Sequence, residues 1–303
     1  MKKKSLAILL AAAMILSLTG CGAKQTEESS ANTAVTETPT DTPTEAVQAT
    51  DTPEAAPEDT AEAIDMSGVK LLNDGTLTIG VEIGYPPFED FAEDGTTPVG
   101  YDVDFAKALS EKLGVQVNFI NTAWDGIFQG IGTNYDCVIS AVTITDKRKE
   151  TMLFSDPYIN NYQSVVVRPD FAKEIKSFND LDGLSIAVQK ETTSDVLMSD
   201  YVSTGTIKCT ISANEKITTC FTQLDNGEVD AVVVDSTVAD GYLATSPDKY
   251  VKAYQDESEP EQFGVAMGKD NTPLQTAINQ AIAQLTKEGF FEDNIAYWFG
   301  SSK

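Results

Sequence analysis

The chain contains no histidine among its 303 residues. Histidine is the commonest general base of enzymes near neutral pH and a frequent metal ligand. Its absence excludes Ser-His and Cys-His nucleophilic sites. Cysteine is also scarce, and Cys21, Cys137, Cys209 and Cys220 form no CxxC pair, the usual spacing of zinc ligands. We therefore expect no metal site and no cofactor.

The chain also has few positively charged residues. Lysine and arginine number 21 against 47 aspartates and glutamates, which gives a formal net charge of -26. Such a chain repels nucleic-acid phosphates and anionic lipid headgroups, so we expect no nucleic-acid partner. Hydrophobic residues make up 41% of the chain, enough to bury a core, and the length allows two domains.

The first 21 residues, MKKKSLAILLAAAMILSLTGC, have a basic start, an apolar run and small residues before a cysteine. The apolar run is shorter than the roughly 20 residues of a membrane span, so residues 1–20 are predicted to be a signal peptide. Residues 18–21, LTGC, resemble the lipobox of bacterial lipoproteins. That resemblance implies a lipid on Cys21, which would anchor the protein outside the cytoplasm, at the cell surface or in the periplasm.

Residues 21–66 are rich in Thr, Pro, Ala, Glu and Asp and contain almost no large apolar side chain. Such a segment cannot bury enough surface to offset its ordering entropy. We interpret it as a disordered tether with a reach of about 35 Å.

The folded part is predicted to begin with a strand near Thr76, where apolar residues alternate. Residues 103–114 then show helical spacing, with Asp102 as the expected cap and Gly114 as the end. A strand over 115–120 completes a strand-helix-strand unit.

Similar units follow, so the sequence predicts an α/β fold with two parallel sheets. A helix is expected over WDGIFQGI (124–131). Extended crossovers between the sheets are expected over 163–169 and 263–267. Further strands are expected over 136–142, 184–189, 206–211 and 230–235.

A cluster of positive charge, Lys147 to Lys149, follows the predicted strand 136–142. Ligands of open α/β sheets lie beyond the carboxyl ends of the strands, and a short helix starting near Asp146 would present N–H groups there. Arg148 adds a planar fork that matches a carboxylate. The alternative is that Arg148 only pairs with Asp146 or Glu150 on the surface.

Seven motifs and a terminal WFG (298–300) resemble, in order and spacing, the family 3 extracellular solute-binding proteins, the amino-acid receptors of ABC importers. The resemblance covers about residues 70–300. The motifs are GYPPFED (84–90), VGYDVDFAKALSEKLG (99–114), WDGIF (124–128), TITDKRKE (143–150), FSDPY (154–158), VQKETTSD (188–195) and NGEVDAVVVD (226–235).

The resemblance implies a type II periplasmic-binding-protein fold, in which two α/β lobes are joined by a two-strand hinge and the ligand lies in the cleft. It places the first lobe at 70–164, the second at 165–260 and a return to the first at 261–303. It also implies a monomer that binds an amino acid, performs no chemistry, and works with a permease and an ATPase in trans.

In the family, the arginine matching Arg148 takes the ligand α-carboxylate and the acid matching Asp235 takes the α-ammonium. Asp235 could instead cap the next helix, since aspartate is a favoured cap. The first lobe is expected to contribute Ser140, Ala141 and Thr143, and the second lobe Thr192 and Thr193.

Tyr85 and Trp124 match positions where the family stacks rings on the ligand side chain, although either could belong to the core. Glu82 and Gln189 match positions near the ligand tip. An acid there favours a polar or basic amino acid over an acidic one. Ala141 departs from the serine that some basic-amino-acid receptors carry.

Two other functions and one disulfide stay open. Periplasmic dehydratases of prephenate-like acids share this fold, and such an enzyme would need Glu82 or Asp235 as its proton donor. A sensory lipoprotein that signals through a partner is the third possibility. Export would also permit a disulfide between Cys209 and Cys220.

Overall fold

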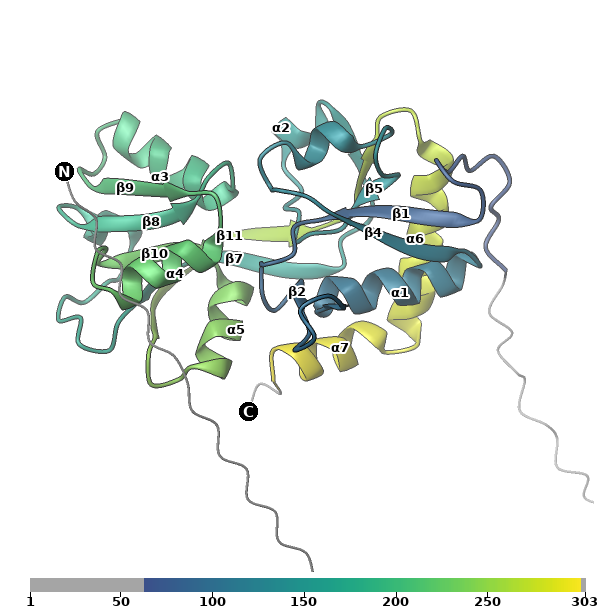
Figure 1. Ribbon diagram of the computed structural model, residues 1–303. Helices are drawn as coiled ribbons and strands as arrows, with labels where there is room; N and C mark the ends of the chain where they lie inside the picture. The colour runs from purple at the N-terminus through teal and green to yellow at the C-terminus, as the bar shows by residue number, and fades with distance from the viewer. Residues whose placement is uncertain (1–62, 301–303) are drawn as a thin grey trace, which may run out of the picture. The chain divides into compact units, whose positions relative to one another are not determined.

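The computed structural model describes residues 63–300, which form two five-stranded sheets, a two-stranded sheet and the helices around them (Figure 1). The predicted signal peptide (1–20), Cys21 and the predicted tether up to residue 62 lie outside the described residues.

The first sheet has the order β4-β1-β5-β12-β6. Its central strand β1 (Thr76–Val81) is parallel to β4 (Gln116–Asn121) and β5 (Cys137–Val138). The strands β12 (Ala266–Gly268) and β6 (Met152–Phe154) complete it in antiparallel pairings. We call the elements around this sheet the first lobe.

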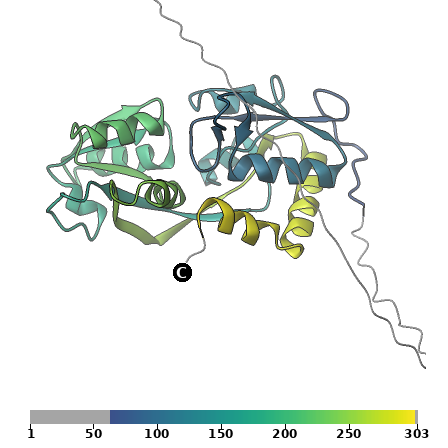
Figure 2. The same cartoon turned by 60° about the horizontal axis from the view of Figure 1, so that its bottom comes forward.

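Three helices of the first lobe pack on one another (Figure 2). They are α1 (Tyr101–Leu113), α6 (Thr272–Lys287) and α7 (Phe290–Trp298). A short hairpin of β2 (Asp90–Phe91) and β3 (Pro98–Val99) precedes α1. The short helix α2 (Asp146–Lys149) follows β5.

The second sheet has the order β11-β7-β10-β8-β9 and defines the second lobe. Three of its strands are parallel: β10 (Ala231–Asp235), β8 (Ser185–Gln189) and β9 (Thr210–Asn214). Its helices are α3 (Thr193–Ser203), α4 (Ile217–Asp225) and α5 (Ser236–Thr245), with a short 3-10 helix at Phe178–Leu181.

The strands β7 (Ile159–Val167) and β11 (Val251–Phe263) form the hinge (Figure 1). They pair antiparallel, and the register shifts between Asp256 and Glu261. The first crossing comes earlier than the predicted 163–169, because these residues already pair with β10. The return lies at the predicted place, between Phe263 and β12. Both sheets are mixed rather than purely parallel, since the hinge strands and β12 run antiparallel.

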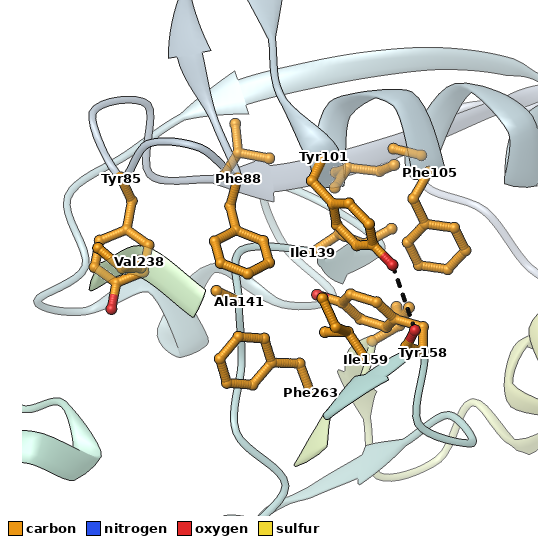
Figure 3. Packing of buried hydrophobic residues seen from close by; sticks show 14 of the residues in the cluster. Tyr85, Phe88, Tyr101, Phe105, Ile139, Ala141, Tyr158, Ile159, Val238 and Phe263 are labelled. Atoms are coloured by element: carbon orange, nitrogen blue, oxygen red, sulfur yellow. Dashed lines mark hydrogen bonds between the residues drawn. The ribbon is translucent and has the colours of Figure 1, made fainter. Parts of the chain in front are cut away.

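A group of aromatic rings anchors the hinge to the first lobe (Figure 3). The Phe88 ring lies 5.7 Å from that of Tyr101 and 5.4 Å from that of Phe263, both edge-on. Phe88 and Phe263 are fully buried. Phe263 is the last residue of β11, so its packing in the first-lobe core holds this end of the hinge strand in place.

Several local predictions differ from the structure. Residues 124–131 contain only a 3-10 helix, Ile127–Gly130, because Gly126 adopts a left-handed conformation with φ 89°. The strand expected over 136–142 is limited to β5. The strand expected over 206–211 lies later, at β9. Gly114 ends α1 as predicted, but Gly100 rather than Asp102 occupies the cap position.

The disulfide left open between Cys209 and Cys220 is not formed. Both thiols are free, and burial raises the pKa of Cys220 to about 12. These cysteines are structural side chains of the second lobe.

Candidate functional site

One cavity is lined by all eleven residues that the sequence singled out for ligand binding. Its empty volume is about 290 Å³, including space open to solvent, which suits a small ligand. The first lobe contributes Glu82, Tyr85, Trp124, Ser140, Ala141, Thr143 and Arg148, and the second contributes Gln189, Thr192, Thr193 and Asp235. The structure brings these residues together; their roles toward a ligand stay predictions.

Arg148 enters the cavity from α2, whose cap Thr145 accepts a hydrogen bond from the Arg148 amide at 3.1 Å. The guanidinium donates to the Thr143 carbonyl at 2.9 Å and lies 5.4 Å from the centroid of the Trp124 ring. Burial lowers its pKa.

Surface pairing does not account for Arg148. Within residues 63–300, Asp146 pairs with Lys149 at 3.5 Å, and Arg148 forms no ion pair with Asp146 or Glu150. The guanidinium therefore keeps donors for an anion in the cavity.

Asp235 ends β10 on the second-lobe side. Its Oδ1 accepts hydrogen bonds from Asn161 Nδ2 at 2.6 Å and Gln163 Nε2 at 3.0 Å, and its Oδ2 accepts from the Tyr85 hydroxyl. Burial, with repulsion from Glu261 as a second cause, raises the pKa of Asp235 to about 7. Asp235 occupies the N-cap position of α5, but its side chain makes no capping hydrogen bond there, so its carboxylate is not used as a cap.

Glu82 and Gln189 meet across the cavity. Gln189 Nε2 donates to Glu82 Oε2 at 2.7 Å, which joins the end of β1 to the end of β8. Burial raises the pKa of Glu82 to about 7, against the opposing effects of Gln189 and Lys216. The buried Oε1 of Gln189 has no hydrogen-bond partner among the described residues, so a ligand donor could satisfy it.

Ser140 and Ala141 are held by two acids that sequence reasoning missed. The Ser140 hydroxyl donates to Glu89 and accepts from the Glu82 amide at 3.1 Å. The Ala141 amide donates to Asp102 Oδ2 at 2.6 Å. The Ser140 hydroxyl and the Ala141 amide, in residues that the resemblance assigned to ligand binding, are thus engaged within the first lobe. Both acids fall inside quoted motifs, which was the available signal.

Asp102 and Glu89 are almost fully buried, at 1% and 0% exposure. Burial and their mutual repulsion raise the pKa of Glu89 well above its usual range, and burial raises that of Asp102 to about 7. They support the backbone at Ala141, whose φ of 46° is left-handed and unusual for a residue other than glycine. Asp102 and Glu89 therefore help to determine the backbone conformation of the cavity wall at Ala141.

The threonines connect the cavity wall to its surroundings. Thr192 caps α3, accepting from the Asp195 amide at 3.3 Å, and its hydroxyl donates to the Gln189 carbonyl at 2.7 Å. Thr143 and Thr193 both donate to Glu261, at 3.3 and 3.4 Å. Glu261 is a further residue that sequence reasoning missed.

Tyr85 and Trp124 are each 7% exposed, line the cavity and belong to apolar clusters. Trp124 packs edge-on against Phe128 at 5.4 Å. Tyr85 and Val238 of the second lobe belong to the same apolar cluster (Figure 3). The sequence left core and cavity as alternatives for these two rings, and in the structure each ring belongs to both.

A two-lobed α/β body with opposite charges lining one cavity is typical of solute-binding proteins. The chain belongs to family 3 of the bacterial extracellular solute-binding proteins, whose family model matches residues 77–301.

Two kinds of relative illustrate the family. The L-cystine-binding protein TcyJ of Escherichia coli (strain K12) is 31% identical over 233 residues, 77% of this chain and 85% of TcyJ. The structure of an ancestral arginine-binding protein bound to arginine is 35% identical, with a TM-score of 0.69, and covers 75% of this chain and 99% of that one.

A third similar structure is described as an ancestral amino-acid-binding protein that is a precursor of cyclohexadienyl dehydratase. It is 35% identical with a TM-score of 0.67 and covers 74% of this chain and 96% of that one. These likenesses agree with the type II periplasmic-binding-protein fold of two lobes on a two-strand hinge.

Residues 63–300 contain no helix that is long and apolar enough to cross a membrane. The same residues contain no group of three or more Cys, Asp or Glu arranged to hold a metal ion.

Proposed function

We propose that the protein is an extracytoplasmic receptor that binds a free amino acid, polar or basic, and delivers it to an ABC importer. The observation that carries the proposal is that Arg148 of the first lobe and buried Asp235 of the second line the same cavity. A guanidinium suits an α-carboxylate and a carboxylate suits an α-ammonium, so together they fit a zwitterion.

Binding would work through the hinge. Arg148 belongs to the first lobe and Asp235 to the second, so one ligand can hold both only when the lobes are close together. Hinge closure around a ligand is a known transition of such folds, and the ligand favours the state in which it makes more contacts.

The charges around the cavity support a polar or basic ligand. Asp235 would neutralise an α-ammonium and Arg148 an α-carboxylate, which leaves Glu82 and the unpartnered Oε1 of Gln189 for the side chain. An acidic side chain would bring a second carboxylate to buried Glu82. The related TcyJ is named for cystine and the ancestral structure for arginine. Arginine ends in a guanidinium, and the far half of cystine carries an ammonium beside a carboxylate, so both ligands are polar.

We further propose how the protein is anchored, where its lobes begin and end, and which partners it works with. Residues 1–20 would act as a signal peptide and Cys21 would carry the lipid anchor, with the tether to residue 66 spacing the binding body from the membrane. We place the first lobe at 70–164, the second at 165–260 and the return at 261–303. The protein would act as a monomer, with a permease and an ATPase in trans.

A dehydratase is the second candidate. Glu82 is buried with its pKa raised to about 7, so it could hold a proton for a leaving hydroxyl near neutral pH. The likeness to the precursor of cyclohexadienyl dehydratase adds to this candidate. We favour binding without chemistry because Asp235 supplies the ammonium partner that a non-amino acid does not use.

A thermal-shift screen tests the proposal. Protein stripped of co-purified ligand is screened against the twenty amino acids, cystine, ornithine and prephenate. A ligand at a thousandfold excess over Kd stabilises the folded state by roughly 4 kcal/mol. We expect a clear shift with one polar or basic amino acid. A shift with prephenate alone, followed by its turnover, would establish the dehydratase instead.

A further inference from the structure

Hydrogen bonds from both lobes and from the hinge meet at Glu261, a residue of β11 just before the chain returns to the first sheet. Its Oε2 accepts from Thr143 Oγ1 of the first lobe at 3.3 Å and from Thr193 Oγ1 of the second at 3.4 Å. It also accepts from Asn161 Nδ2 and Gln163 Nε2 of the hinge strand β7, both at 3.0 Å. One carboxylate oxygen of Glu261 therefore accepts hydrogen bonds from the first lobe, the second lobe and the hinge strand β7.

The two hinge amides also hold Asp235. Asn161 Nδ2 and Gln163 Nε2 donate to Asp235 Oδ1 at 2.6 and 3.0 Å. A side-chain amide has two N–H donors, so each amide can bridge the two carboxylates. Glu261 and Asp235 are thus held as a pair by the same groups.

The side-chain oxygens of both amides are hydrogen-bonded as well. Asn161 Oδ1 accepts from the Thr237 hydroxyl at 3.1 Å, and Gln163 Oε1 accepts from the Ser194 hydroxyl at 2.6 Å. Asn161 is fully buried, and Gln163 is 5% exposed. Neither amide can turn away from Asp235 without losing these bonds. Removal of Glu261 would therefore leave an Asn161 donor unpaired beside Asp235, whereas Gln163 Nε2 would keep Thr193 Oγ1 as an acceptor at 3.1 Å.

We propose that Glu261 is a positioning residue that fixes Asp235 and joins the two lobes through Thr143 and Thr193. The first half of this proposal rests on the proposed function, since it assumes that Asp235 receives a ligand ammonium. The second half concerns the lobes alone and holds for any ligand.

The first test is calorimetric titration of the stripped protein with L-arginine and L-cystine. Glu261→Ala removes the acceptor and should weaken binding more than tenfold at pH 8, where Asp235 is mostly ionised with or without the repulsion from Glu261. Glu261→Gln keeps an acceptor oxygen of the same reach and should recover at least half of that loss on a logarithmic scale. Glu259→Ala, on the same strand and exposed, is the matched control and should bind as the wild type does. An affinity of Glu261→Ala within tenfold of wild type, or no recovery with glutamine, would overturn the positioning of Asp235.

The second test is hydrogen exchange of the ligand-free protein, which needs no amino acid. Glu261→Ala should speed exchange at residues 82–85 and 189–193, which face each other across the cavity, and leave α1 unchanged. Unchanged exchange at both segments, or an equal rise in α1, would overturn the role of Glu261 between the lobes. If Glu261→Ala does not fold, Thr143→Val and Thr193→Val each remove one lobe's bond to Glu261 and should give the same local result.

The two tests separate the possible failures. If wild-type protein binds no amino acid in the thermal-shift screen, the proposed function fails, and the exchange measurement still decides whether Glu261 joins the lobes. If wild type binds and the Glu261 variants bind equally well, only the inference about Glu261 fails.

Discussion

The wall formed by Ser140 and Ala141 is held by acids of its own lobe, whereas the wall that carries Asp235 is held by hinge amides and by Tyr85 of the opposite lobe. The first wall should therefore keep its shape when the lobes separate. The second should lose part of its support at the same time. This difference indicates that the Asp235 end of the cavity, where we propose that the α-ammonium binds, is the end that depends on closure of the lobes.

The largest expected effect comes from Arg148→Ala, which removes the first lobe's positive charge from the cavity. We expect at least ~100-fold weaker amino-acid binding, because charge-assisted hydrogen bonds contribute about 1.5–3 kcal/mol each. The melting temperature should stay close to that of the wild type. Exposed Lys147, in the same helix, provides the control Lys147→Ala. Calorimetric affinity of Arg148→Ala within a few-fold of wild type would remove Arg148 from the site.

The second wall is tested by the pH dependence of affinity. Asp235 has a pKa raised to about 7 in the free protein, and a bound ammonium would require it ionised. Binding then releases a proton below pH 7, so affinity should fall as pH falls, by up to about tenfold per unit. Asp235→Asn should weaken binding at pH 8 by about tenfold or more and flatten the profile between pH 5 and 7. Titration across that range measures both, and an unchanged slope in the variant would assign the proton to another group.

Asp102→Asn tests whether the first wall is built in advance. Burial raises the pKa of Asp102 from 3.8 to about 7. The folded state therefore holds its proton more tightly than the unfolded state, so this contribution is complete below about pH 4 and is lost as pH rises through 7. The wild-type free energy of unfolding should fall over that window, by on the order of 3 kcal/mol from this group.

Asp102→Asn should make that pH profile flatter, because an amide does not titrate. Denaturant unfolding at pH 5, 6, 7 and 8 measures the effect, with exposed Asp248→Asn as the control. Parallel profiles for wild type and Asp102→Asn would show that the proton resides elsewhere in the buried network of Glu89, Glu82 and Asp235.

Tyr85→Phe should have the smallest effect. It removes one hydroxyl donor to Asp235 but leaves both hinge amides in place. We expect a loss of about 0.5–1.5 kcal/mol in binding, which is roughly two- to tenfold in Kd. Tyr297→Phe, at a residue 76% exposed, should change nothing in the same titration. A loss as large as that of Asp235→Asn would mean that the hydroxyl contacts the ligand itself.

The sequence predicted the parts of the fold that depend on local periodicity. The strand from Thr76 and the helix ended by Gly114 follow directly from apolar spacing and a left-handed glycine. It did not predict the limited strand at Cys137–Val138, because Ala141 takes its left-handed conformation from tertiary bonds to Asp102. The mixed sheets were missed because pairing direction depends on where the hinge strands lie.

The eleven candidate residues were found through motifs shared with a family, and the structure places all of them around one cavity. Glu89, Asp102 and Glu261 were not found. Asp102 looked like a helix cap, and Glu261 lies in an acidic stretch, 256–261, that has no pattern of its own. Their positions depend on contacts between segments more than 35 residues apart, which spacing does not reveal.

The most direct test of the central claim is a crystal structure with the amino acid identified by the thermal-shift screen. We expect one amino acid in the cavity, with its α-carboxylate on Arg148 and its α-ammonium within hydrogen-bond distance of Asp235. Its side chain should point toward Glu82 and Gln189. A ligand bound outside this cavity, or one whose ammonium does not meet Asp235, would contradict it.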